Sequence, residues 1–289
     1  MVRFFSRPRL LCPALTLLLA LSASAETRSL LILHTNDLHG HVRAGTGGTG
    51  GLPYIAGYVA QERAKRSDIL LLDAGDVTEK GDMVAFHTKN KVTYEAMGRM
   101  KYDAVVPGNH DFSLGLDQLN ANRALLGATA FLCINCLDDS GKPRWEASHV
   151  FEVNGLRVGV IGATVIGIKG GALGFDVTAD RIAEEAARLD KDCHVLVVLA
   201  HVGVDDCRAL AAKVPSIDVF VSGHTHELLR TPARAGNGAI IVQTGNYAER
   251  IGSIDLAADT ETHTVKMVKG GVVEMDHNAV PCDSEMLAR

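Results

Sequence analysis

The sequence has no surplus of positive charge. It contains 29 Lys and Arg against 34 Asp and Glu, which gives a formal net charge of −5. Proteins that bind nucleic-acid polymers neutralise the phosphate backbone with clustered cations, so this balance argues against such a partner. With 47% hydrophobic and 22% charged residues, the composition is globular and excludes disordered, collagen-like and coiled-coil proteins.

Long apolar runs are also scarce. The single candidate, residues 10–21, follows three arginines between positions 3 and 9 and precedes a small-residue site at 23–25. About a dozen apolar residues fall short of the roughly 20 that span a bilayer, which disfavours an anchoring helix. The pattern predicts a cleaved signal peptide over residues 1–25. We therefore expect a periplasmic or secreted protein without a membrane span.

An odd number of cysteines follows the predicted signal peptide: Cys133, Cys136, Cys193, Cys207 and Cys282. At least one of them is outside any intrachain disulfide. The spacing Cys133-x-x-Cys136 fits a small disulfide, a redox pair, or two buried residues at the end of a strand. A lone pair of this kind argues against a structural zinc site.

Short apolar runs alternate with amphipathic stretches from Leu30 onward. The runs read as strands at Leu30–His34, Ile69–Asp73, Asp103–Val106, Arg157–Ala163, Val195–His201 and Ile217–Gly223. Helical spacing covers Leu52–Arg66, Lys91–Met100, Leu114–Leu126, Ala179–Leu189 and Asp205–Val214. This alternation predicts one α/β domain over residues 26–289 with largely parallel sheets.

The last part of the chain has a different order of predicted elements. Three predicted strands, 239–244, 253–258 and 263–268, follow one another without helices. We expect them to close the sheet as antiparallel neighbours. The glycine-rich segment 45–51 lacks the Lys-Ser/Thr ending of a P-loop and the strand–helix context of a dinucleotide site, so it is interpreted as a loop.

Polar residues gather where the predicted strands end. These segments are Asp37-Leu38-His39, Asp76, Asn109-His110-Asp111, His201, and His224-Thr225-His226. Parallel α/β sheets place their sites at the carboxyl ends of strands. Seven donors exceed the needs of one tetrahedral ion and suit two ions sharing a bridge. Mixed nitrogen and oxygen donors favour Zn, Mn or Fe over Ca.

These motifs resemble those of the calcineurin-like metallophosphoesterases. The opening segment Leu33–Gly40, together with Gln243–Tyr247, is similar to the 5′-nucleotidase-like branch. The resemblance spans about residues 30–256. It implies a four-layer α/β/β/α sandwich with mixed sheets.

The resemblance also implies a role for each residue of the motifs. One divalent ion would take Asp37, His39 and His226, the other Asn109, His201 and His224, and Asp76 would bridge them. His110 matches the family's catalytic histidine, which stabilises the transition state or protonates the leaving oxygen. A structural hydrogen-bonding role is the alternative for His110.

Two departures from the family stand out. Many 5′-nucleotidases carry an Asp three residues after the catalytic histidine, where this chain has Ser113. Asp111 is the acid adjacent to His110 and is taken as the candidate partner of that histidine. Secreted 5′-nucleotidases also carry a C-terminal domain with aromatic residues that stack the nucleobase, whereas residues 259–289 hold no Phe, Tyr or Trp. We expect this C-terminal nucleotide-binding domain to be absent.

His41 and Arg43 follow the first metal motif and are candidate contacts to a substrate phosphate, with ordinary surface residues as the equal alternative. The sequence thus predicts an exported two-metal phosphomonoesterase for small phosphorylated substrates, possibly nucleotides, in which a metal-activated water attacks. Alternatives are a cyclic-nucleotide or other phosphodiesterase, a thiosulfohydrolase-like enzyme, and a non-catalytic metal-holding binding protein.

Overall fold

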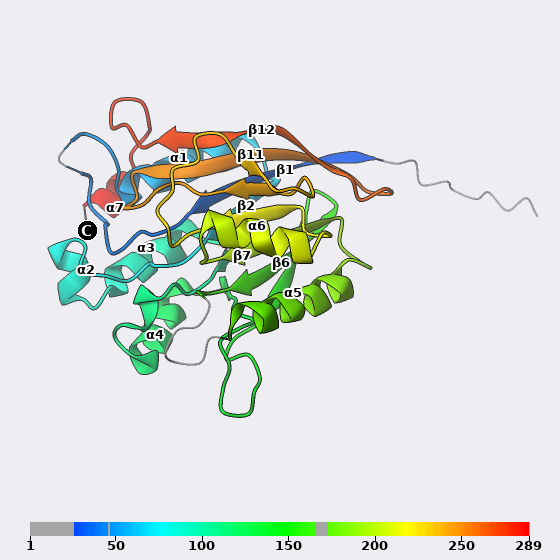
Figure 1. The fold of residues 1–289 in the computed structure, drawn as a ribbon. Helices are drawn as coiled ribbons and strands as arrows, with labels where there is room; N and C mark the ends of the chain where they lie inside the picture. The colour runs from blue at the N-terminus through cyan, green and yellow to red at the C-terminus, as the bar shows by residue number, and fades with distance from the viewer. Residues whose placement is uncertain (1–25, 46, 166–172, 289) are drawn as a thin grey trace, which may run out of the picture.

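Two sheets build the centre of the molecule (Figure 1). The computed structural model describes residues 26–45, 47–165 and 173–288. The predicted signal peptide, residues 1–25, lies outside this described part. Within it, no helix is long and apolar enough to cross a membrane.

The first sheet has the strand order β12-β11-β1-β2-β3-β4. Its strands are β1 (Thr27–Thr35), β2 (Ile69–Asp73), β3 (Ala104–Val105), β4 (Ala130–Phe131), β11 (Arg250–Asp259) and β12 (Val265–Glu274). Strands β1 to β4 run parallel, while β11 is antiparallel to β1 and β12 is antiparallel to β11. The prediction of antiparallel closure is therefore right for the last two strands.

The second sheet has the order β5-β6-β7-β8-β10-β9. Its strands are β5 (Ser148–Val153), β6 (Leu156–Ala163), β7 (Val195–Ala200), β8 (Val219–Ser222), β9 (Ala233–Arg234) and β10 (Ile240–Val242). Strand β10 pairs parallel with β8. The expectation that 239–244 joins the same antiparallel group as β11 and β12 is wrong, because this strand completes the other sheet.

Helices cover the outer face of each sheet. The first sheet carries α1 (Leu52–Lys65), α3 (Lys91–Met100) and α4 (Leu116–Arg123), and the second carries α5 (Phe175–Leu189) and α6 (Val204–Lys213). Shorter elements are α2 (Met83–His87), α7 (Ser284–Leu287) and the 3-10 turns η1 (His110–Phe112) and η2 (Ala124–Leu126). The sequence analysis missed β4, β5, β9, α2 and α7, which are short or partly exposed and so carry weak periodicity.

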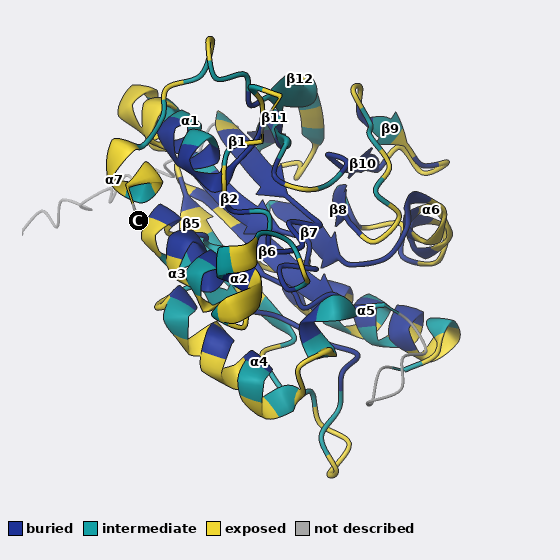
Figure 2. Ribbon diagram, turned by 90° about the vertical axis from the view of Figure 1, so that its left-hand side faces the viewer, coloured by how far each residue is buried: buried dark blue, intermediate teal, exposed yellow. Residues whose placement is uncertain are grey.

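Side chains alternate along β1 between two hydrophobic cores. Leu30 and Ile32 pack into the core between the sheets, whereas Leu31 and Leu33 pack against α1 and α3. A third core lies between the second sheet and α5 and α6. Figure 2 shows the buried strands at the centre of these layers. The predicted four-layer α/β/β/α sandwich with mixed sheets is confirmed.

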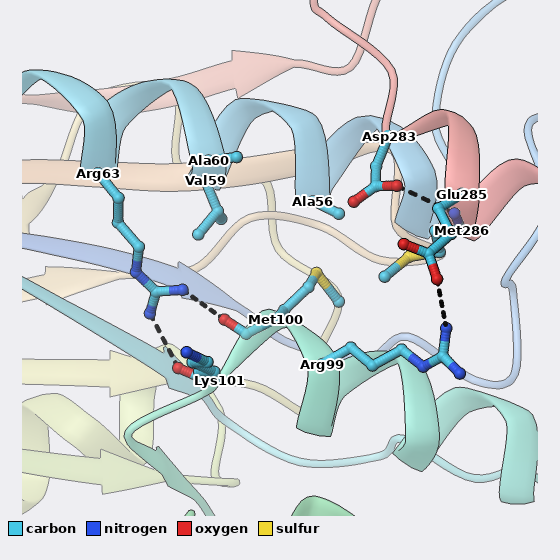
Figure 3. Close-up of a pocket in the computed structure, with 10 residues that line it drawn as sticks. All are labelled: Ala56, Val59, Ala60, Arg63, Arg99, Met100, Lys101, Asp283, Glu285 and Met286. Atoms are coloured by element: carbon cyan, nitrogen blue, oxygen red, sulfur yellow. Dashed lines mark hydrogen bonds and ion pairs between the residues drawn. The ribbon is translucent and has the colours of Figure 1, made fainter.

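The C-terminal segment docks on α1 (Figure 3). Gly57 lies in the middle of α1, and a Cβ there would stand 1.9 Å from the carbonyl oxygen of Pro281, so glycine permits the close approach. The Asp283 amide donates to the carbonyl of Pro53. Glu285 lies 4.0 Å from Arg99 of α3. A cavity of about 480 Å³ remains between α1, α3 and α7.

All five cysteines of the described part are free thiols, and four of them are buried. Cys133 and Cys136 follow β4, and the Cys133 thiol donates a hydrogen bond of 3.3 Å to Oδ1 of Asn135. Burial raises the pKa of Cys133 well above the usual value for a thiol. Among the three interpretations of this pair, the structure agrees with two buried residues at the end of a strand.

Candidate metal centre

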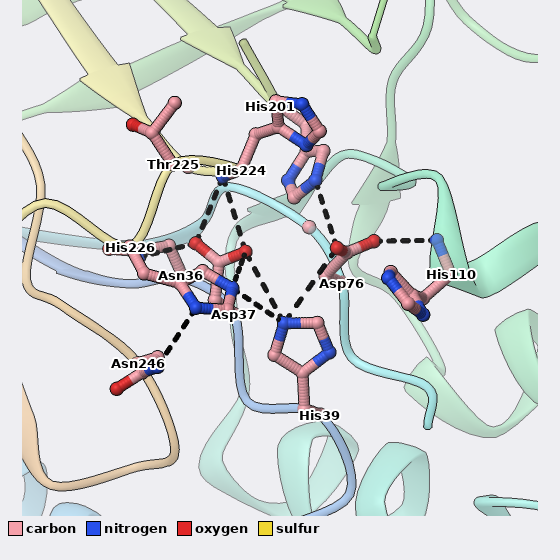
Figure 4. Close-up of polar contacts among 12 residues, drawn as sticks. Asn36, Asp37, His39, Asp76, His110, His201, His224, Thr225, His226 and Asn246 are labelled. Carbon is pink, nitrogen blue, oxygen red and sulfur yellow. Dashed lines mark hydrogen bonds and ion pairs between the residues drawn. The ribbon is translucent and has the colours of Figure 1, made fainter. Parts of the chain in front are cut away.

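The loops that follow β1, β2, β7 and β8 meet at one edge of the two sheets. They bring six of the predicted ligands into two groups (Figure 4), Asp37 with His39 and His226, and Asp76 with His201 and His224. Within each group, one potential ligand atom per residue lies within 4.8 Å of the others. The first group has the same residues as one predicted half, and the second contains Asp76 with His201 and His224 but not Asn109.

Asp76 stands between the two groups. Its Oδ2 lies 3.1 Å from Nε2 of His201 and 3.8 Å from Nε2 of His39. Its Oδ1 accepts a hydrogen bond of 2.8 Å from the amide of His110. A Cβ at Gly108 would stand 2.1 Å from this oxygen, so glycine is needed for the loop after β3 to pass here. The position suits a carboxylate that bridges two ions.

The buried polar atoms of the centre fit a divalent cation. Oδ1 of Asn109 is buried without a hydrogen-bond partner among the described residues, and Nε2 of His201 has no hydrogen bond of good geometry there, although it lies 3.1 Å from Asp76. A buried acceptor or ring nitrogen left unpaired is costly, and coordination would satisfy both. Carboxylate, imidazole and amide donors together suit a borderline ion such as Zn, Mn or Fe.

The backbone at these positions is unusual. Five predicted ligands have left-handed conformations: Asp37 (φ +52°), His39 (+48°), Asp76 (+56°), His224 (+77°) and His226 (+56°). This region costs a non-glycine residue about 1–3 kcal/mol when the surroundings impose it, and such residues cluster at functional sites. The strands and loops therefore hold the ligands in place against a local conformational cost.

The electrostatic environment is strongly anionic. Burial lowers the pKa of His201, but the nearby carboxylates of Asp76 and Asp37 outweigh it and raise that pKa to about 9. His39 behaves alike, since burial lowers its pKa and the same carboxylates together raise it above the usual value. A site that draws protons onto buried imidazoles also attracts a divalent cation.

Neighbouring groups fix the orientation of the imidazoles. Nδ1 of His201 lies 2.6 Å from the carbonyl oxygen of Ala74, to which it donates, leaving Nε2 toward Asp76. Nδ1 of His226 lies 2.9 Å from the Asn246 side-chain nitrogen. Contacts of this kind set the tautomer and ring orientation of metal-binding histidines. The segment Gln243–Tyr247, which the sequence analysis singled out, thus contacts a candidate metal ligand through Asn246.

The carboxylate that faces His110 is Glu79, which the sequence analysis missed. Glu79 Oε1 lies 3.4 Å from Nδ1 of His110. Its Oε2 lies 2.7 Å from Nδ1 of His39, although out of line for a hydrogen bond. No motif marks Glu79, because its position depends on how the loop after β2 folds back.

Asp111 has a different environment from the one expected of a partner for His110. Its buried carboxylate accepts hydrogen bonds from the amides of Asp76, Thr78 and Gly108 and from the Tyr94 hydroxyl, at 2.8–3.0 Å. Burial raises the pKa of this carboxyl. In this arrangement Asp111 ties the loop after β2 to the loop after β3.

The two predicted phosphate contacts lie apart from each other. The His41 ring packs against Tyr247, with ring centroids 4.3 Å apart, and Tyr247 in turn lies 5.7 Å from the ring of His39. Arg43 is exposed and lines a cavity formed with α1, α3 and the C-terminal helix. Only His41 is therefore close to the metal centre, at the rim formed by Tyr247.

Comparison with known proteins agrees with this geometry. The family model for calcineurin-like phosphoesterases matches residues 30–228. Endonuclease YhcR of Bacillus subtilis (strain 168) is 26% identical over 91% of this chain and 25% of its own length. A snake venom 5′-nucleotidase from Crotalus adamanteus is 30% identical over 78% of this chain and 42% of its own length.

The solved structure of a 5′-nucleotidase precursor from Thermus thermophilus aligns with a TM-score of 0.77 and 25% identity, over 89% of this chain and 57% of that one. The chain spans between about a quarter and about half of the length of three curated relatives that it matches. The matched region contains the first two loops of the centre and both histidines that follow β8. The chain therefore belongs to the calcineurin-like phosphoesterase family, as its sequence predicted.

Proposed function

We propose that this enzyme hydrolyses small phosphate monoesters, nucleotides among them, at a centre of two divalent ions. The observation that carries the proposal is the position of Asp76, whose carboxylate lies between two groups of ligands. In this proposal Asp37, His39 and His226 hold one ion, Asn109, His201 and His224 hold the other, and Asp76 contacts both. When bound, such a pair supplies positive charge that activates a water and neutralises phosphoryl oxygens.

The chain's own residues do the remaining work. Hydrolysis forms a bond from the water oxygen to phosphorus and breaks the bond from phosphorus to the ester oxygen. His110 lies beside Asp76, with its ring 5.0 Å from that of His39, which suits donation of a proton to the departing oxygen. A positioned general acid contributes about 10²–10⁴ in rate.

Glu79 is proposed as the residue that positions His110. Its contact to Nδ1 of His110 leaves the other ring nitrogen, Nε2, available to the substrate. The same carboxylate lies against His39, so one side chain orients both a metal ligand and the acid. Glu79 would thus replace the Asp that many 5′-nucleotidases carry at the position of Ser113.

The direct test is a turnover screen of purified protein loaded with Mn, Zn or Fe. We expect hydrolysis of p-nitrophenyl phosphate and of nucleoside monophosphates, loss of activity with a chelator, and recovery when metal is restored. Metal analysis should give two ions per chain. Failure to hydrolyse any phosphate ester would overturn the proposal.

The same screen separates monoester from diester hydrolysis. The similarity to an endonuclease supports testing bis-p-nitrophenyl phosphate alongside the monoester. A higher kcat/KM for the diester would replace the proposed monoesterase with a phosphodiesterase that uses the same centre.

Export is proposed from the N-terminal sequence. The cationic start, the short apolar run and the small residues before Glu26 support a cleaved signal peptide. Mass spectrometry of the protein from its native cell should find a mature chain beginning at Glu26 outside the cytoplasm. A chain that retains residues 1–25 in the cytoplasm would contradict export.

A further inference from the structure

A pocket of about 540 Å³ opens directly beside His110. Its walls come from the loop after β2, from α2 and the turn that follows, and from η1. The lining residues are Thr78, Glu79, Lys80, Phe86, His87, Lys89, Asn90, His110, Ser113 and Leu114. His110 therefore belongs both to the metal centre and to this pocket.

The pocket has unpaired positive charge in a protein that is negative overall. Lys80 and Lys89 are exposed, and neither ammonium group has an ion pair or hydrogen bond within the described part of the chain. The one carboxylate in the lining, Glu79, is turned toward His39 and His110. Two free cations beside a phosphate-hydrolysing centre suit a ligand with negative charge of its own.

The pocket also has an exposed apolar wall. Phe86 is 49% exposed and Leu114 is 45% exposed, although both are large hydrophobic residues. Scattered exposed apolar side chains need no explanation, but these two line the same pocket as the proposed acid. The Phe86 ring makes an edge contact with His87, with centroids 5.5 Å apart, and its exposed part can stack on a flat ring.

The position of His110 indicates which part of a substrate reaches this pocket. In the proposed function, the scissile phosphate would lie over the metal ligands and the oxygen that receives the proton would lie at His110. The group attached to that oxygen must then extend past His110, where the pocket is the adjacent open space.

We propose that this pocket binds the leaving group, and that its preferred leaving group combines a planar aromatic ring with a phosphate. In this arrangement the ring stacks on Phe86 and the additional phosphate lies near Lys80 and Lys89. A nucleoside diphosphate has this chemistry, because its hydrolysis releases a nucleoside monophosphate. The inference rests on the proposed function and specifies its substrate class.

The test compares three substrates with metal-loaded protein. ADP has an aromatic leaving group with a phosphate, AMP has an aromatic leaving group without one, and glycerol phosphate has neither. Phe86→Ala should lower kcat/KM by about tenfold for ADP and AMP, since alanine substitution of a base-stacking aromatic typically has this effect. Glycerol phosphate should be hydrolysed at an unchanged rate.

Substitution of Lys80 and Lys89 should affect hydrolysis of ADP more than hydrolysis of AMP. The double variant Lys80→Ala, Lys89→Ala should lower kcat/KM for ADP by about fivefold or more, with a smaller change for AMP, because exposed charges contribute modestly. Matched controls are Met83→Ala, which is 67% exposed on the same helix as Phe86, and Lys91→Ala at the start of α3. Neither residue lines the pocket.

A binding measurement makes the test independent of catalysis. Calorimetry should show that AMP binds the metal-free wild-type protein. Its affinity should be lower for the Phe86→Leu variant and lowest for the Phe86→Ala variant. Equal effects of Phe86→Ala on all three substrates, or equal AMP binding by wild type and variants, would overturn the assignment. If AMP binds through Phe86 while no substrate is hydrolysed, the proposed function fails and the pocket assignment stands.

Discussion

The metal centre and the pocket beside His110 lie next to each other but are built differently. In the centre, Asp37, Asp76 and His201 are buried, and each contacts several fixed neighbours. In the pocket, Lys80, Phe86 and Lys89 are exposed, and the ammonium groups have no partner within the described part of the chain.

This difference matches what each region must do. Ligand distances must be accurate before an ion binds, so the centre is held by many hydrogen bonds and a strained backbone. Selectivity for the rest of the substrate tolerates looser placement, and exposed loop side chains can provide it. The following substitutions test whether the chemistry and the selectivity are separated in this way.

The largest effect is expected in the centre, from Asp76→Asn. Loss of the shared carboxylate removes several kcal/mol of transition-state stabilisation, equivalent to about 10³-fold in kcat or more. Every phosphate ester should be affected alike, because the leaving group does not contact Asp76. Steady-state kinetics and metal analysis of the purified variant measure both changes.

A matched control for this variant is Asp73→Asn, at the end of the strand that leads into the Asp76 loop. Burial raises the pKa of Asp73 to about 8, and its two oxygens accept hydrogen bonds from the Thr35 hydroxyl and the Gly75 amide rather than facing the ligand groups. Turnover of Asp73→Asn should remain close to that of wild type. A comparable loss in both variants would show that the Asp76 effect is structural.

An intermediate effect is expected at the boundary between the two regions, from Glu79→Gln. Loss of a carboxylate that orients a metal-binding imidazole typically costs about 10–100-fold. Because Glu79 also positions the proton donor, kcat should fall more for an alkyl phosphate than for p-nitrophenyl phosphate, whose leaving group needs little protonation. If Glu79 had a purely structural role, Glu79→Gln would lower kcat equally for both substrates.

Ser113 offers a way to restore what Glu79→Gln removes. Ser113 lines the same pocket as Glu79 and His110, and the resemblance to 5′-nucleotidases implies an acid at this position. In a double-mutant cycle, Ser113→Asp should recover part of the lost kcat in the Glu79→Gln protein and change little in wild type. Glu95→Gln, on the exposed face of α3, serves as the neutral control, and strictly additive effects would refute the positioning role.

A smaller effect on activity, with a clear effect on stability, is expected from Asp111→Asn. The amide cannot accept all the hydrogen bonds that the carboxylate accepts, so the free energy of unfolding should fall by about 2–4 kcal/mol. Urea denaturation of the metal-free protein measures this change. Asp117→Asn, on the exposed first turn of α4, is the control, and an equal effect of both would show that the loops are not held by Asp111.

The smallest effect is expected from reduction. Since all five described cysteines are free, a phosphine reductant should alter neither the melting temperature nor kcat. Alkylation of the unfolded, unreduced protein followed by mass spectrometry should label all five. A labelled count below five would reveal a disulfide and contradict the thiol pair at Cys133 and Cys136.

The clustering of the candidate ligands was predictable because they follow strand ends, and strand ends are marked by apolar runs that stop at Gly, Asp or His. Asp37, Asp76 and His201 belong to this class. Glu79 was not predictable, since a loop folds back to bring it to His110. The sequence also could not predict which sheet β10 joins, because strand pairing depends on the whole core and not on the sequence of the strand.

The left-handed backbone at five of the proposed ligand positions determines which substitutions these loops tolerate. Asn tolerates that conformation about as well as Asp or His does. A single change of a ligand to Asn would therefore remove the chemistry while leaving the loop path unchanged. In such a variant the proposed chemistry would be lost, whereas the surface and the pocket beside His110 would keep their positions.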